Sequence, residues 1–152
     1  MEFNINKVLP KDNSNFNGFR IIRPITAIYM LVMVVRSCIH LFSSDGGANS
    51  IAGIDLSVAG GDNIIAIFHQ WGAIQLILAV LLFVMFFRYP GLTPLVLLTL
   101  AMDPVMRFIS GHIKAITAVG TPPGASLNGA AFCLLTALFI VSLIEKDHTK
   151  SK

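Results

Sequence analysis

Charged residues are scarce in this sequence. Aspartate, glutamate, lysine and arginine make up 12% of its 152 residues, whereas hydrophobic residues make up 55%. A soluble domain carries about twice that charged fraction, so the composition indicates an integral membrane protein. The basic residues are scattered rather than gathered into a patch, and we therefore expect no nucleic-acid partner.

Cysteine and catalytic motifs are also sparse. The two cysteines, Cys38 and Cys133, form neither a disulfide framework nor a CxxC motif. We interpret both as small hydrophobic residues, with a bond between them left open because sequence does not test its geometry. Paired catalytic carboxylates, a phosphate-binding glycine loop and a Ser–His–Asp order are lacking, so no catalytic residue is expected and no cofactor is identified.

Long apolar runs dominate what remains. A helix of about 20 apolar residues crosses the hydrocarbon core, and only helices or closed barrels satisfy the backbone in lipid. The sequence therefore predicts an all-α integral membrane protein, a bundle of four transmembrane helices. We expect a polar tail at 1–23, spans at 24–42, 64–87, 92–119 and 127–144, and a charged tail at 145–152.

The basic residues at the ends of these runs predict the orientation. They lie in the two tails and in the turn after the second span: Lys7, Lys11, Arg20, Arg23, Arg88, Lys146, Lys150 and Lys152. The other two connections contain no lysine or arginine. Positive residues remain on the cytoplasmic side, so both termini are expected there.

The third apolar run is interrupted by Asp103 and Pro104. A proline inside a helix removes a backbone hydrogen bond and disfavours helical geometry in the residue before it. One interpretation is a kink, which membrane helices tolerate. The other is a break, with Asp103 capping a restarted helix, as in proteins that bind ligands between half-helices.

Several polar side chains share the outer half of the expected bilayer. Asp103 and Arg107 are four residues apart, so on a continuous helix they lie on one face and form a pair. Intramembrane charge is costly and by default suggests a functional site, although a structural ion pair is an equal alternative. The residues that we expect to bind a ligand are Arg36, His40, His69, Gln70, Asp103 and Arg107.

Two arginines against one acid would leave this pocket net positive. A positive pocket suits a lipid head group, a carboxylate or the polarised carbonyl of a quinone. Snorkelling of Arg36 to the interface is the simpler alternative. His40, His69 and His112 also raise the hypothesis of a metal site, but no single helix carries a metal-binding histidine spacing.

The segment from Asp103 to Ser110, Asp-Pro-Val-Met-Arg-Phe-Ile-Ser, is followed by Pro122-Pro123-Gly124 and an apolar last helix. This part of the chain, about its last third, resembles the DoxX-like small four-helix bacterial membrane proteins and a related family of unknown function. The resemblance implies the bundle fold and the bacterial inner membrane. Some DoxX-like proteins are subunits of quinone-linked oxidoreductases, but the resemblance carries over no catalytic residue.

The sequence thus favours a non-catalytic accessory subunit of a membrane complex, with a polar pocket for a lipid or quinone head group. Its expected partners are the bilayer and either other membrane subunits or further copies of the chain. Two alternatives remain open. One is a small proton-coupled transporter that uses Asp103 and the histidines, and the other is a histidine-liganded metal site in a membrane oxidoreductase.

Overall fold

The computed structural model describes residues 3–145, which form helices and connecting loops without a sheet. A single isolated bridge pairs Phe3 with Ile144. The elements are η1 (Ile5–Val8), α1 (Ile22–Phe42), α2 (Gly61–Arg88), η2 (Pro90–Leu92), α3 (Thr93–Ile113), α4 (Pro123–Ser126) and α5 (Asn128–Ser142). The predicted all-α class is therefore confirmed for this part of the chain, and the expected tail beyond residue 145 lies outside it.

Three segments are long and apolar enough to cross a membrane: α1, α2, and Pro90–Ile113, which joins η2 to α3. The fourth apolar helix, α5, has 15 residues and is about 22 Å long at 1.5 Å per residue. It is shorter than the hydrocarbon core of about 30 Å. The described chain thus has three long apolar helices and one short one, and the expected count of four spans stays a prediction.

The third helix differs from the expected span 92–119. It ends at Ile113, and residues 114–122 form an irregular connection that begins with Lys114. This connection was expected to lack basic residues, and the earlier helix end places one lysine in it. Pro104 lies inside α3, which runs without interruption from Thr93 to Ile113, so the helix does not stop and restart at Asp103.

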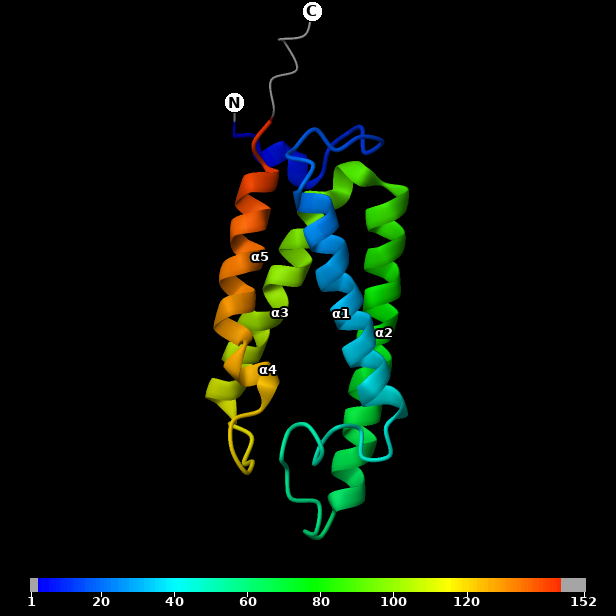
Figure 1. Ribbon diagram of the computed structural model, residues 1–152, viewed down its shortest axis with the longest axis vertical. Helices are drawn as coiled ribbons and strands as arrows, with labels where there is room; N and C mark the ends of the chain where they lie inside the picture. The colour runs from blue at the N-terminus through cyan, green and yellow to red at the C-terminus, as the bar shows by residue number, and fades with distance from the viewer. Residues whose placement is uncertain (1–2, 146–152) are drawn as a thin grey trace, which may run out of the picture.

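The helices form two antiparallel pairs, with α1 packed on α2 and α3 on α5 (Figure 1). Phe3 lies beside Ile144, so both ends of the described chain are at one end of the bundle, which we call the terminal end. The connections 43–60 and 114–122 lie at the opposite end, the loop end (Figure 1). The two pairs approach each other near the terminal end and diverge toward the loop end.

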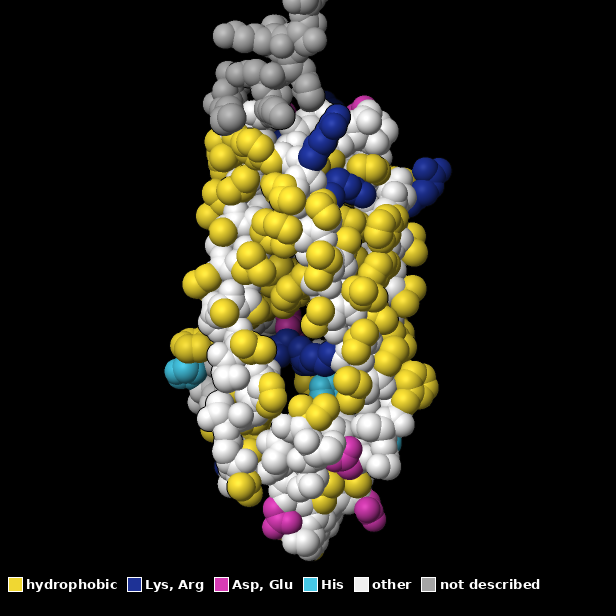
Figure 2. All heavy atoms as spheres, viewed as in Figure 1, with side chains coloured by type: hydrophobic (Ala, Val, Ile, Leu, Met, Phe, Trp, Pro, Cys, Tyr) yellow, Lys and Arg dark blue, Asp and Glu magenta, His cyan; other side chains and the backbone are white. Residues whose placement is uncertain are grey.

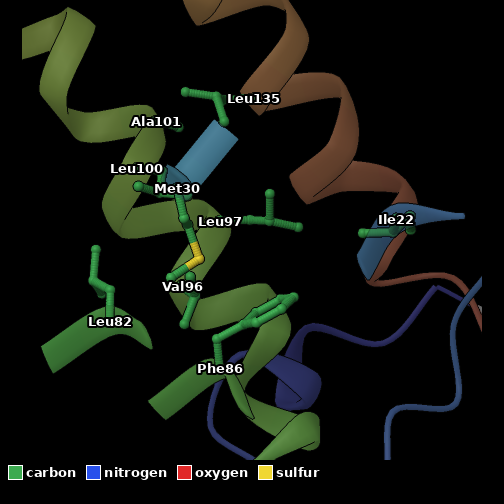
Figure 3. Packing of buried hydrophobic residues seen from close by; sticks show 9 residues of the cluster. All are labelled: Ile22, Met30, Leu82, Phe86, Val96, Leu97, Leu100, Ala101 and Leu135. Carbon is green, nitrogen blue, oxygen red and sulfur yellow. The ribbon is translucent and has the colours of Figure 1, made fainter. Parts of the chain in front are cut away.

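The hydrophobic core occupies the half of the bundle nearer the terminal end. It consists of buried side chains from α1, α2, α3 and α5 (Figure 3): Ile22, Met30, Leu82, Phe86, Val96, Leu97, Leu100, Ala101 and Leu135. The α3 residues among them all precede Pro104. Packing of these side chains joins the two helix pairs near the terminal end.

The polar N-terminal tail is held by the bundle itself. The Asn4 N–H donates to the Leu143 carbonyl, and the Lys7 ammonium donates to the Ile144 carbonyl at 3.3 Å. Further along, the Gly91 N–H donates to the Asn13 carbonyl, and Phe16 packs against the core. These contacts hold the described part of the tail against the bundle.

Arg23 joins the start of α1 to the turn between α2 and α3. Its guanidinium donates to the Thr93 hydroxyl at 2.8 Å and to the Phe86 carbonyl at 3.0 Å. It also lies over the Phe86 ring, 4.2 Å from the ring centroid. This arginine, expected only as an orientation signal, therefore also fixes the terminal end.

Candidate functional site

In the loop half of the bundle, an arginine of α1 lies over an aromatic ring of α2. Arg36, in the last turns of α1, places its guanidinium carbon 5.0 Å from the centroid of the Trp71 ring on α2. A guanidinium over an indole face gains cation–π attraction, and that attraction is stronger away from water. Among residues 3–145 no carboxylate is within ion-pair distance of Arg36.

Asp103 and Arg107 form the ion pair that their spacing predicts. The pair lies on α3 just beyond the core, and each side chain is a little over one quarter exposed. Because α3 is continuous through Pro104, the i,i+4 geometry brings the carboxylate and guanidinium together. The ion pair neutralises one arginine and leaves the other without a counterion.

Arg36 and Trp71 belong to the α1–α2 pair, whereas Asp103 and Arg107 belong to α3 of the other pair. Figure 2 shows basic side chains in a hollow of the viewed face, with an acidic side chain just above them and a histidine just below. Two arginines, Arg36 and Arg107, against the single carboxylate of Asp103 give these three side chains a net positive charge, and the expectation that they share one pocket stays a prediction.

His40 forms the support behind Trp71. Its ring is buried, 4.5 Å from the Trp71 centroid and 5.8 Å from that of Phe68, and its Nδ1 bonds the Gly46 carbonyl at 2.7 Å. Gly46 has φ +60°, and a Cβ there would lie 2.7 Å from the Phe68 Cβ. The loop therefore turns back onto His40, and the His40 ring packs against Trp71 and Phe68.

The other predicted ligand residues are placed differently. His69 Nε2 bonds the Ser43 carbonyl at 2.9 Å, so this histidine holds the loop between α1 and α2. Gln70 is exposed and makes no hydrogen bond to a residue of the described chain. His112 bonds the Phe108 carbonyl and packs on the Phe108 ring. Between residues 3 and 145, no three histidine, cysteine or acidic side chains gather as a metal site would require.

The two cysteines are free thiols. Cys38 is half-buried on α1 and Cys133 is exposed on α5. No disulfide bond therefore joins Cys38 to Cys133 in this structure.

Two contacts that shape the site were not foreseen. Asn128, at the start of α5, donates to the Pro104 carbonyl at 2.9 Å and so joins α5 to α3 beside the ion pair. On the α1–α2 pair, a Cβ at Gly72 would lie only 2.6 Å from the Leu41 nitrogen. Because Gly72 has no side chain, α1 and α2 can approach closely there. Asn128 is a polar residue at the start of an apolar run, and that isolation was the signal available in the sequence.

Asp45 organises the loop next to the site. Its carboxylate accepts backbone hydrogen bonds from Ser50 at 2.7 Å, Gly47 at 2.8 Å and Asn49 at 3.1 Å. These bonds, the one from Ser50 first, hold the pKa of Asp45 well below its ordinary value. The same loop reaches the other helix pair, because the Val119 N–H donates to the Gly53 carbonyl at 2.8 Å.

Comparison with protein-family models, curated proteins and solved structures finds no match to this chain. The resemblance to the DoxX-like family stays a prediction.

Proposed function

We propose that this protein spans a membrane four times and binds the polar head group of a lipophilic molecule in the hollow between its two helix pairs. One observation carries the proposal: the Arg36 guanidinium lies on Trp71 without a carboxylate partner in the described chain, while Asp103 on the other helix pair is already paired with Arg107. A charge removed from water without a partner is costly. A ligand that brings a negative or strongly polarised oxygen would offset that cost.

The chemistry of the hollow favours anions and carbonyl groups. A guanidinium presents several N–H donors in a plane and binds carboxylate and phosphate oxygens in pairs. The side of the indole ring and the apolar flanks of the helices suit the attached hydrocarbon. A phospholipid and a quinone both meet this description.

The proposed membrane topology rests on the charge distribution and on α5. The basic residues of the described chain lie mainly at the terminal end, and the loop between α1 and α2 carries Asp45 and Asp55. This asymmetry supports cytoplasmic termini in a bacterial inner membrane. We propose that α5, extended by residues 127 and 143–144, is the fourth span and that Pro104 kinks α3.

Trp71 is the single tryptophan of the chain and provides the test. The purified protein in phosphatidylcholine nanodiscs is titrated with an anionic phospholipid whose acyl chains carry bromine, a contact quencher of indole fluorescence. Because the head group is drawn toward Arg36, we expect saturable quenching at a low fraction of the brominated lipid. Arg36→Gln should raise the midpoint about tenfold or more, the loss expected for a charge-assisted bond.

The control is Arg88→Gln, the same substitution at an exposed arginine of the terminal end. It removes an equal charge from the protein and should leave the midpoint unchanged. If Arg36→Gln and Arg88→Gln shift the midpoint equally, the lipid is only attracted to overall charge, and the binding proposal is wrong.

A role as a non-catalytic subunit of a larger complex is a second proposal, supported by α5. This helix is short for a span and exposes large apolar side chains, including Phe132 and Leu134, at its loop half. A partner helix would cover them. Purification in mild detergent should then give a species larger than one chain, and a single 16.5 kDa species would contradict this role.

A further inference from the structure

Two buried polar atoms beside the ion pair lack hydrogen-bond partners among the described residues. They are Arg107 Nε, which is a donor, and Asn128 Oδ1, which is an acceptor. Buried polar atoms are nearly always satisfied, so each such atom points to a missing partner. Here one partner must accept and the other must donate.

The contacts around these atoms fix their identity. The Asn128 amide nitrogen donates to the Pro104 carbonyl, which could not accept from the amide oxygen, so Oδ1 must be the free end. Arg107 lies against the turn of α4, where a Cβ on Gly124 would be 3.2 Å from its Nη1. Both unsatisfied atoms therefore belong to the α3–α5 pair, whereas Arg36 belongs to the α1–α2 pair.

Acceptor-only groups do not satisfy both atoms. A quinone carbonyl or a carboxylate can accept from Arg107 Nε, but it has no hydrogen to give Asn128 Oδ1. A hydroxyl both donates and accepts. An anion, in turn, is what Arg36 lacks. An anionic oxygen against Arg36, and a hydroxyl or a water molecule at Arg107 Nε and Asn128 Oδ1, would together satisfy these groups.

Building on the proposed function, we infer that the ligand is an anionic phospholipid whose head group carries a free hydroxyl next to its phosphodiester. The phosphodiester is placed against the Arg36 guanidinium, and the hydroxyl is placed between Arg107 Nε and Asn128 Oδ1. The acyl chains then leave the hollow along the apolar flanks of α1 and α5. A neutral quinone satisfies neither requirement.

The test compares two lipids that differ in the head-group hydroxyls. Brominated phosphatidylglycerol and brominated phosphatidylmethanol, with the same acyl chains, are each titrated into phosphatidylcholine nanodiscs that hold the full chain. Trp71 quenching is measured as before. We expect phosphatidylglycerol to reach its midpoint at about a five- to tenfold lower fraction, the effect of one or two hydrogen bonds.

Asn128→Leu should abolish this difference by raising the phosphatidylglycerol midpoint to that of phosphatidylmethanol, whereas Asn63→Leu, at an exposed position of α2, should preserve it. Equal midpoints for the two lipids in the wild-type protein, both raised by Arg36→Gln, would overturn the hydroxyl inference and leave anion binding intact. That result would mean that water satisfies the two atoms. Quenching midpoints that do not change in Arg36→Gln would overturn both proposals.

Discussion

The two halves of the bundle are built differently from the same four helices. In the terminal half, side chains of α1, α2, α3 and α5 meet in one apolar core, and Arg23 and the N-terminal tail fasten its outer edge. In the loop half, α1 and α2 remain tightly packed through Gly72, but every α3 residue after Pro104 is half-buried or exposed. The difference indicates that packing in the terminal half stabilises the fold. The loop half contributes little to that packing and can therefore contain charged side chains.

The largest effect that separates the halves should come from the core. Leu82→Ala empties a buried site on α2, whereas Leu81→Ala changes its exposed neighbour. We expect the first to lower the free energy of unfolding by about 2–5 kcal/mol and the second to change it little. Unfolding by sodium dodecyl sulfate in mixed micelles measures both. Equal losses would show that this core does not carry the stability of the bundle.

The next effect concerns the close approach of α1 and α2. Gly72→Ala places a methyl group against the backbone of Leu41, and overpacking costs about 1–3 kcal/mol. Gly111→Ala serves as the control, because a Cβ there meets nothing within 4 Å. It should be neutral or stabilising by up to about 1 kcal/mol, the helix-propensity gain of alanine. The same unfolding assay tests whether only Gly72 is sensitive.

A smaller, local effect is expected at the loop. Asp45→Asn removes the charge that binds three backbone N–H groups, so cleavage within residues 43–60 by a protease should speed up, with Asp55→Asn as the milder control. Because folding lowers the pKa of Asp45, its contribution is present above the unfolded value of about 3.9 and is lost as the pH falls below it. Loop protection that declines already between pH 8 and pH 5 would contradict this assignment.

The smallest effect on stability should come from the loop-half arginine. Arg36→Gln removes a partly desolvated charge without an acidic partner in the described chain, so the free energy of unfolding should stay the same or rise slightly. A loss comparable to that of Leu82→Ala would mean that Arg36 is structural, and the contrast between the halves would fail.

Much of this architecture could be predicted from the sequence, because apolar runs and charge placement follow from the lipid environment. The helices over 24–42 and 64–87 were expected within a few residues of α1 and α2, and the Asp103–Arg107 pair follows from helical spacing. The early end of α3 at Ile113 was not predicted, because residues 115–119 are as apolar as the helix before them.

The site was predicted in part. Helical spacing predicts the Asp103–Arg107 contact within α3, whereas the placement of Arg36 over Trp71 joins two different helices. The roles of His69 and His40 as supports of a loop depend on the backbone path of Ser43 and Gly46, which no periodicity reveals. The contact between Asn128 and Pro104 joins residues 24 positions apart and likewise needs the fold.

The most direct test is a contact between lipid phosphorus and the half-buried guanidinium of Arg36. Protein with ¹⁵N-labelled arginine is placed in phosphatidylglycerol-containing bilayers, and dephasing of the guanidinium ¹⁵N signals by ³¹P is measured by solid-state NMR. We predict a strongly dephased signal that survives Arg88→Gln and disappears in Arg36→Gln. Identical dephasing in the wild type and Arg36→Gln would show that no phosphate reaches the hollow.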